Sequence, residues 1–155
     1  MAAIRAADLG LQVTILESMP KPARKLGISG KGRGNLTNTE PFNTFLKHFN
    51  NEGRFLKSAF KAFFNTDLVE FFNKEGLPTV EERGGRVFVA SGRAVEAVAC
   101  LHKAIERRRV QLVVNRPVTG LIVEKGQCLG AIAGGNPARH RRSVIPGHRL
   151  DRRRP

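Results

Sequence analysis

The order of apolar and polar positions predicts helix and strand in turn at the start of the chain. Residues 1–9 are rich in alanine and predict a helix, which Gly10 would end in the left-handed conformation that glycine tolerates. The run 11–17 (LQVTILE) is short, mostly apolar and β-branched, which is typical of a strand buried on both faces of a parallel sheet. Together they form the second half of a βαβ unit, whose first strand would lie before Met1.

The middle of the chain predicts helices followed by a hairpin. Phenylalanines in residues 42–76 follow the three-to-four spacing of helices, and Asn65 or Thr66 is expected to cap a second helix there. Two apolar runs, 77–82 and 86–90, flank an Arg-Gly-Gly turn and therefore predict a hairpin.

The last third of the chain returns to alternating elements. Ser91 is expected to cap a helix that runs to about Arg108. Strands are predicted over residues 110–114, 118–124 and 128–133. The whole pattern predicts the α/β fold class, with a helical and hairpin segment, residues 41–90, inserted between two α/β ends.

Composition places the chain among soluble globular proteins. It has 155 residues, of which 41% are hydrophobic and 26% charged, and no run approaches the ~18 apolar residues that cross a bilayer. Two distant cysteines, Cys100 and Cys128, form neither a disulfide framework nor a metal site, and no histidine has metal-ligand spacing. We expect a cytoplasmic protein with no metal and no membrane partner.

The net charge of +14 is concentrated near the C-terminus. Residues 136–155 hold seven arginines and one acid, a net charge of +6, and show neither helical nor strand periodicity. Such charge drives non-specific binding to nucleic acid. We expect residues 134–155 to be a basic tail, disordered or read out of frame, and nucleic acid to bind only non-specifically through it.

Glu17 is the most informative single position. In a dinucleotide-binding βαβ unit, an acid at the end of the second strand accepts hydrogen bonds from the adenosine ribose, about 20 residues after a G-x-G-x-x-G turn. Counting back that far from Glu17 ends just before Met1. Spacing alone supports this role and that of a solvated carboxylate at a strand end equally.

A glycine-rich segment follows in a basic, polar stretch, residues 18–40, that has little periodicity. Gly30 and Gly32 permit close approach of backbone N–H groups to a phosphate or a planar ring, and Arg33 adds a fork of donors for an anion. No Gly-Lys-Ser/Thr pair opens a following helix, so the segment is not a P-loop. The glycine pattern by itself favours an ordinary flexible loop.

Nine of the ten phenylalanines lie between Phe42 and Phe72, interleaved with lysine and arginine. Such a mixture can form a stacking platform for single-stranded nucleic acid. The helical spacing and the lack of Trp and Tyr favour a packed core with the basic residues on its outer face.

The longest family resemblance lies in residues 24–38. Their sequence, RKLGISGKGRGNLTN, resembles the RKLLISGxGRCNLTN signature of the YhiN/BaiN-like family of FAD-dependent oxidoreductases. Residues 2–17 and the GGRVF stretch at 84–88 support it, and the resemblance covers about residues 1–132. It implies an incomplete Rossmann-like FAD-binding domain over residues 1–133, without its first strand and glycine turn.

The resemblance also implies a cofactor site. The cofactor-binding residues would be Glu17, Lys25, Gly30, Gly32, Arg33, Asn35 and Val118. Glu17 would bind the adenosine ribose, Lys25 would lie near the pyrophosphate, and Val118 would present its backbone to the adenine; the others would line the isoalloxazine and ribityl chain. FAD would be reduced by NAD(P)H and would act on a small-molecule substrate. No residue stands out as catalytic.

The chain departs from the family pattern at Gly34, where the signature has Cys, and near Gly134, where the resemblance is expected to end. We therefore expect a piece of a flavoprotein truncated at both ends, with a tail that resembles an out-of-frame reading of GC-rich DNA. The alternative is a catalytically inactive fragment or a small basic protein that binds polyanions.

Overall fold

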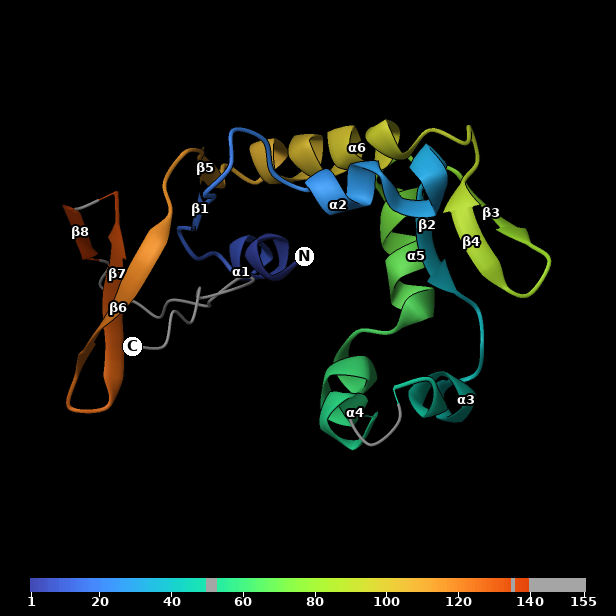
Figure 1. Ribbon diagram of the computed structural model, residues 1–155, viewed down its shortest axis with the longest axis horizontal. Coiled ribbons are helices and arrows are strands. Elements are labelled where there is room, and N and C mark those ends of the chain that lie inside the picture. Colours follow the sequence, from blue (N-terminus) through green and yellow to red (C-terminus); the bar gives the residue numbers. More distant parts are fainter. Residues whose placement is uncertain (50–52, 135, 140–155) are drawn as a thin grey trace. The chain divides into compact units, whose positions relative to one another are not determined.

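The computed structural model describes residues 1–49, 53–134 and 136–139, and these form two compact units (Figure 1). Unit 1 combines the two ends of the chain, Met1–Pro22 and Ile105–Pro155, whereas unit 2 is the continuous stretch Ala23–Ala104. The α/β fold class is confirmed, because both units contain helices and strands. No helix in the described ranges is long and apolar enough to cross a membrane.

Unit 1 begins with the helix and strand that the sequence predicts. Helix α1 (Ala2–Asp8) ends at Gly10, whose φ of 78° and N–H bond to the Ala7 carbonyl (2.9 Å) belong to a Schellman motif. Strand β1 (Thr14–Leu16) then pairs in parallel with β5 (Gln111–Val113). Parallel strands cannot be joined by a tight turn, and the connection between β1 and β5 contains the whole of unit 2.

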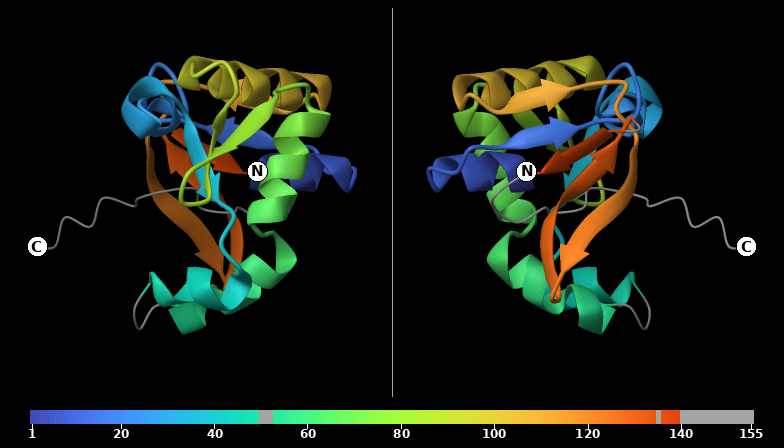
Figure 2. Two further views of the ribbon diagram at one scale, coloured as in Figure 1. Left: turned by 90° about the vertical axis from the view of Figure 1, so that its right-hand side faces the viewer. Right: turned by 90° about the vertical axis from the view of Figure 1, so that its left-hand side faces the viewer.

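A second, antiparallel sheet of unit 1 follows β5. Strands β6 (Val118–Glu124) and β7 (Gln127–Ala133) lie side by side as a long hairpin (Figure 2). Its turn residues, Lys125 and Gly126, have φ of 49° and 77°, as a type I′ turn requires. Strand β8 (Asn136–Arg139) pairs with β7, so these residues of the expected basic tail form a strand; residues 140–155 lie outside the described part.

Unit 2 contains several helices and one small sheet. In chain order its elements are α2 (Arg24–Gly27), the 3₁₀ turn Ser29–Gly32, β2 (Asn35–Asn38), α3 (Phe42–Lys47), α4 (Gly53–Ala62), α5 (Asn65–Lys74), β3 (Thr79–Glu82), β4 (Arg86–Val89) and α6 (Ala94–Arg107), whose last residues belong to unit 1. The sheet has the antiparallel order β2-β4-β3. The predicted hairpin is therefore confirmed, with Gly84 and Gly85 at positive φ in its turn.

The structure of unit 2 departs in places from what the sequence predicts. The stretch 18–40, which has little periodicity and for which no strand was predicted, contains β2, which forms because it pairs with β4 rather than through its own apolar pattern. Helix α6 begins at Ala94 and not next to Ser91, whose hydroxyl donates to the Glu96 carboxylate (2.6 Å). Ser91 therefore holds a side chain of the first helical turn and does not cap a backbone N–H.

The core of unit 2 joins α5, β4 and α6. Its buried members are Phe72, Leu77, Val89, Ala97 and Cys100. A separate group of phenylalanines packs α3 against α4, with ring centroids 5.2–5.9 Å apart. The packed interpretation of the phenylalanine-rich region is therefore confirmed for these rings, while Phe55 on α4 remains 82% exposed.

Candidate functional site

The residues that the sequence singles out for cofactor binding fall in both units. Glu17 and Val118 lie in unit 1. Lys25, Gly30, Gly32, Arg33 and Asn35 lie in unit 2.

Glu17 directly follows β1, at the carboxyl end of the parallel pair. Its backbone N–H donates to the Val113 carbonyl (2.9 Å), which extends the β1–β5 ladder to this residue. The half-buried carboxylate accepts hydrogen bonds at Oε1 from the Met19 N–H (2.8 Å) and the Ser18 hydroxyl (3.2 Å). Among the described residues no donor reaches Oε2, so this oxygen can accept from a ligand.

A backbone hydrogen bond links Glu17 to the segment that leads into Val118. The Glu17 carbonyl accepts from the N–H of Arg116 (2.8 Å), two residues before β6 begins at Val118. Val118 pairs with Ala133 in the β6–β7 ladder and is half-buried. The end of β1 and the start of β6 are thus joined by main-chain contacts, independently of side chains.

The glycine-rich segment of unit 2 has an unusual backbone. Gly30, Lys31, Gly32 and Gly34 all have positive φ, between 56° and 85°. Side chains other than hydrogen are disfavoured at such angles, which explains why three of the four positions are glycine. We call residues 29–34 the glycine loop; it is closed by a hydrogen bond from the Gly34 N–H to the Ser29 carbonyl (3.0 Å).

Two of these glycines differ in what surrounds them. A Cβ at Gly30 would lie 2.9 Å from Cε1 of Phe88, so this position allows the loop to pack on β4. At Gly32 nothing lies within 4 Å of the Cβ position. The backbone at Gly32 is therefore open to a ligand, whereas that at Gly30 is packed on Phe88.

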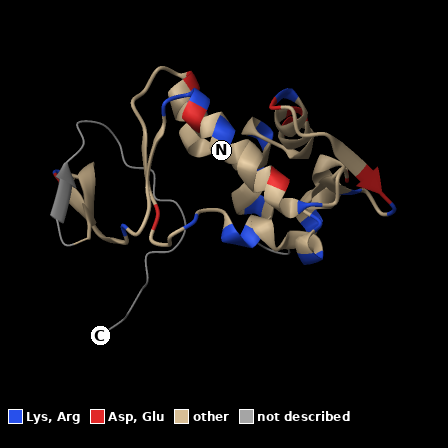
Figure 3. Ribbon diagram, turned by 90° about the horizontal axis from the view of Figure 1, so that it is seen from above, with Lys and Arg blue, Asp and Glu red and all other residues tan. Residues whose placement is uncertain are grey.

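Arg33 is held by the β3–β4 hairpin. Its guanidinium forms a bidentate ion pair with the Glu82 carboxylate, and its Cζ lies 4.5 Å from the centroid of the Phe88 ring. Acidic residues gather on β3 next to the basic end of this hairpin (Figure 3). The predicted anion-binding fork is thus already engaged by a carboxylate of the protein, a contact between residues 49 positions apart.

Lys25 and Asn35 border the glycine loop in sequence. Lys25 is exposed on α2, and Asn35 is the exposed first residue of β2, opposite Phe88 in the ladder. The Asn35 N–H nitrogen lies 3.0 Å from the Cβ position of Gly30, so the loop and the start of β2 are in close contact.

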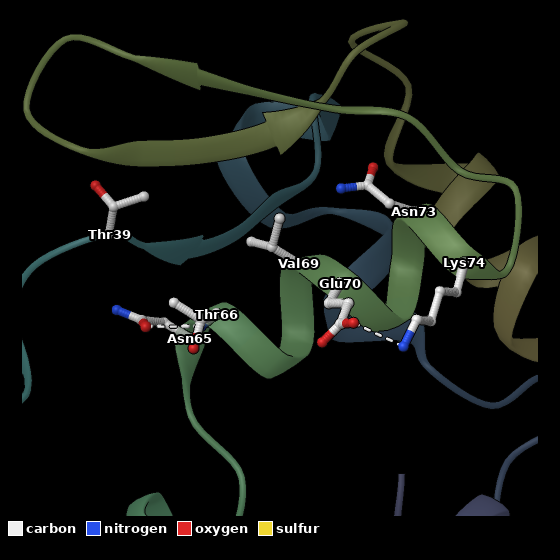
Figure 4. A pocket seen from close by; sticks show the side chains of 7 residues that line it. All are labelled: Thr39, Asn65, Thr66, Val69, Glu70, Asn73 and Lys74. Carbon is white, nitrogen blue, oxygen red and sulfur yellow. Dashed lines mark hydrogen bonds and ion pairs between the residues drawn. The ribbon is translucent and has the colours of Figure 1, made fainter.

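A groove of about 530 Å³ lies between the end of β2 and helix α5 (Figure 4). Its lining is Thr39, Asn65, Thr66, Val69, Glu70, Asn73 and Lys74. The Glu70 and Lys74 side chains form an ion pair (2.6 Å), and Asn65 is buried with its amide donating to the Asn38 and Glu40 carbonyls (2.7 and 3.0 Å). The prediction that Asn65 or Thr66 caps this helix is wrong, because α5 begins at Asn65 and its N-cap is Phe64. The sequence did not predict the groove.

The described residues offer little acid–base chemistry. No group of three His, Cys, Asp or Glu side chains that could hold a metal ion occurs among them. Burial raises the pKa of the Cys100 thiol above its ordinary value, partly opposed by the Lys103 ammonium, so this cysteine is a poor nucleophile. What the arrangement offers is a set of polar backbone and side-chain contacts for binding.

Comparison with known proteins identifies the family. A family model described as "HI0933-like protein Rossmann domain" matches residues 1–147. The match continues beyond Gly134, so the expectation that the family resemblance ends there is wrong.

Curated relatives share this chain's sequence over part of their length. A 3-dehydro-bile acid delta(4,6)-reductase of Clostridium scindens is 33% identical over 123 residues, which cover 78% of this chain and 29% of that protein. Ribosomal RNA dihydrouridine synthases of Escherichia coli and Haemophilus influenzae are 33% and 27% identical, over 54% and 76% of this chain and 20% and 28% of those proteins. The chain therefore spans less than a third of the length of these relatives.

A solved structure supports the fold. Thermovibrio ammonificans THI4 aligns with a TM-score of 0.57 and 13% identity, over 86% of this chain and 42% of that one. With the family match over residues 1–147 and the 33% identity to a curated relative, the chain belongs to the HI0933-like (YhiN/BaiN-like) family of FAD-dependent oxidoreductases, as part of its Rossmann domain.

Proposed function

We propose that this chain is the FAD-binding part of an oxidoreductase that takes reducing equivalents from NAD(P)H and delivers them to a small-molecule substrate. The observation that carries the proposal is the position of Glu17, at the carboxyl end of β1 in a parallel pair, within a family that uses FAD. When bound, FAD supplies the electron-transfer chemistry, and the protein binds and orients it.

Glu17 fits a ribose ligand. Its Oε1 is occupied by the Met19 and Ser18 donors, which fix the carboxylate, while Oε2 remains available within the described part of the chain. A carboxylate that is held on one oxygen and free on the other can accept a hydrogen bond from a ribose hydroxyl. Val118, joined to this region by the Arg116 backbone contact, would offer its backbone to the adenine.

The glycine loop fits a flat or phosphorylated ligand. The open space at Gly32 lets a ring or phosphate approach the backbone, and Gly30 keeps the loop packed on Phe88. Arg33 and Asn35 would lie beside the isoalloxazine and ribityl chain. Lys25, exposed on α2, would contribute positive charge near the pyrophosphate.

The names of the relatives suggest the direction of the reaction. One relative is a reductase of a bile acid derivative, and two others make dihydrouridine in ribosomal RNA, so each name denotes the addition of hydrogen to a substrate. By analogy we propose that the flavoprotein reduces its substrate.

We further propose a cytoplasmic location. Two free thiols, Cys100 and Cys128, suit the reducing cytoplasm. Beyond the small-molecule substrate we propose only non-specific contact with nucleic acid, through the arginines of residues 134–155.

Titration of FAD into the full chain tests the role of Glu17. Glu17→Gln keeps an oxygen for the Met19 and Ser18 donors but removes the charge, so the fold is preserved while the bond to the ribose weakens. We expect FAD affinity to fall about tenfold to a hundredfold, since a hydrogen bond to a charged group contributes about 1.5–3 kcal/mol. Flavin fluorescence or calorimetry measures this change.

The matched control is Glu124→Gln, which removes an exposed carboxylate of the same unit from β6. It should leave FAD affinity unchanged. Absence of saturable FAD binding to the unaltered chain, or an equal loss in both variants, would contradict the proposed role.

A further inference from the structure

The glycine loop is held in place chiefly by the β3–β4 hairpin. Three of its residues contact that hairpin: Gly30 packs on the Phe88 ring, Arg33 pairs with Glu82, and the Gly34 carbonyl accepts from the Val89 N–H (3.2 Å). The hairpin is far from the loop in sequence, so the loop's shape depends on a tertiary contact.

Glu82 lies near two arginines but forms its ion pair with only one of them. Its direct partner across the β3–β4 ladder is Arg86, yet its carboxylate pairs with Arg33. The Arg86 guanidinium lies farther from the Phe88 ring than that of Arg33, 5.7 Å against 4.5 Å, and its Nε donates to the Arg83 carbonyl (3.2 Å). Of the two cations near Phe88, the one that pairs with Glu82 is therefore the closer to the ring.

The Arg33–Glu82 pair orients more than it stabilises. Half of the Arg33 side chain is exposed, and exposed ion pairs contribute little to folding. The two hydrogen bonds and the stack on a buried ring nevertheless orient the guanidinium, because a bidentate pair aligns its plane with that of the carboxylate. A group fixed in this way is preorganised for a ligand.

We propose that Glu82 is a positioning residue of the cofactor site: together with Phe88 it holds Arg33 and the glycine loop in the conformation that binds FAD. The proposal rests on the proposed function for its ligand. The hold on the loop itself exists without any ligand and can be measured separately.

The test compares Glu82→Gln with Glu81→Gln in the full chain. Gln keeps the size of Glu82 but removes the charge that pairs with Arg33. Glu81 is the matched control, since its carboxylate accepts from the Thr39 hydroxyl (3.0 Å) and belongs to the same strand. Phe88→Leu is a second variant that removes the ring under Arg33 while keeping an apolar side chain.

Two measurements are made on each protein. Amide hydrogen exchange without FAD should be several-fold faster across residues 29–34 in Glu82→Gln, with the melting temperature nearly unchanged. With FAD, affinity should fall about tenfold and the visible circular dichroism of the bound flavin should change, because the oriented guanidinium is lost. Glu81→Gln should match the unaltered chain in both.

The outcomes separate the two proposals. Faster loop exchange in Glu82→Gln without FAD binding by the unaltered chain would support positioning of the loop and contradict the proposed function. FAD binding by the unaltered chain with identical exchange and flavin spectra in Glu82→Gln and Glu81→Gln would overturn the positioning role and leave the proposed function standing. A fall in melting temperature as large as that of Phe88→Leu would make Glu82 merely structural and would also overturn it.

Discussion

Arg109 occupies a position where glycine is usual. Helix α6 ends in a Schellman motif in which the N–H groups of Arg109 and Val110 donate to the Glu106 and Ile105 carbonyls (both 2.9 Å), with Arg109 at φ 54°. The same motif ends α1 and α5, but there Gly10 and Gly76 take the left-handed position.

Arg109→Gly is expected to stabilise the protein. A side chain in the left-handed region costs about 1–2 kcal/mol, of which glycine's greater freedom in the unfolded chain returns part. We expect a net gain of about 0.5–1 kcal/mol in the free energy of unfolding, measured by urea denaturation. Arg109→Ala, which keeps a Cβ at the same φ, should give no gain; an equal gain would point to the charge instead.

Gly34 and Gly32 form a natural comparison within the glycine loop. Both have positive φ, but a Cβ at Gly34 would lie 2.7 Å from Cγ2 of Val89, while at Gly32 the space is empty. Gly34→Ala should therefore destabilise the chain by about 1–3 kcal/mol more than Gly32→Ala, because only the former overpacks the core. Thermal unfolding of the two variants measures the difference, and equal losses would show that backbone strain alone is responsible.

At the scale of elements, Asn65 connects α5 to the chain that leads out of β2. Its buried amide donates to the Asn38 and Glu40 carbonyls, and its oxygen accepts from the Thr66 N–H (2.7 Å). Asn65→Leu would remove these three hydrogen bonds at a partly buried site, at an expected cost of about 2–3 kcal/mol. Chemical denaturation measures it, with exposed Thr66→Val as the control; a cost below that of the control would mean that water replaces the amide.

Local signals predicted the elements that depend on local chemistry. The glycine stop of α1, the Gly84–Gly85 hairpin and the bounds of β6 follow from turn residues and alternation, and the structure has them. Strand β2 escaped prediction because Leu36 is its only apolar residue, so its state is set by pairing with β4.

The candidate site was predicted less completely than the fold. Glycine spacing identified the loop, but the Glu82 partner of Arg33 and the groove beside α5 both arise from contacts between distant segments. No periodicity encodes such contacts, and a single sequence carries no record of them.

At the scale of the whole molecule, the two cysteines report on different units. Cys100 is 8% exposed in the core of unit 2, and Cys128 is half-buried on β7 of unit 1. We expect Cys128 to react readily with a thiol reagent in the native protein and Cys100 only after unit 2 opens. Fast labelling of Cys100 in a Cys128→Ser variant would contradict the packing of that core.

The Cys100 thiol makes the stability of the protein depend on pH. Its pKa in the folded chain is raised by burial above the ordinary value of 9.0, so folding favours the protonated form. Its contribution to stability is fully present below that ordinary value and is lost as the pH rises through the folded pKa. Cys100→Ala should remove this alkaline decline, which denaturation at several pH values would show.

The parallel pair β1–β5 has a practical consequence for handling the protein. In the described part of the chain each of these strands has one hydrogen-bonded neighbour, so the opposite edges present rows of backbone donors and acceptors. Such edges act as templates for further strands, including those of other copies. Concentrated solutions should therefore turn cloudy on storage, which light scattering would measure.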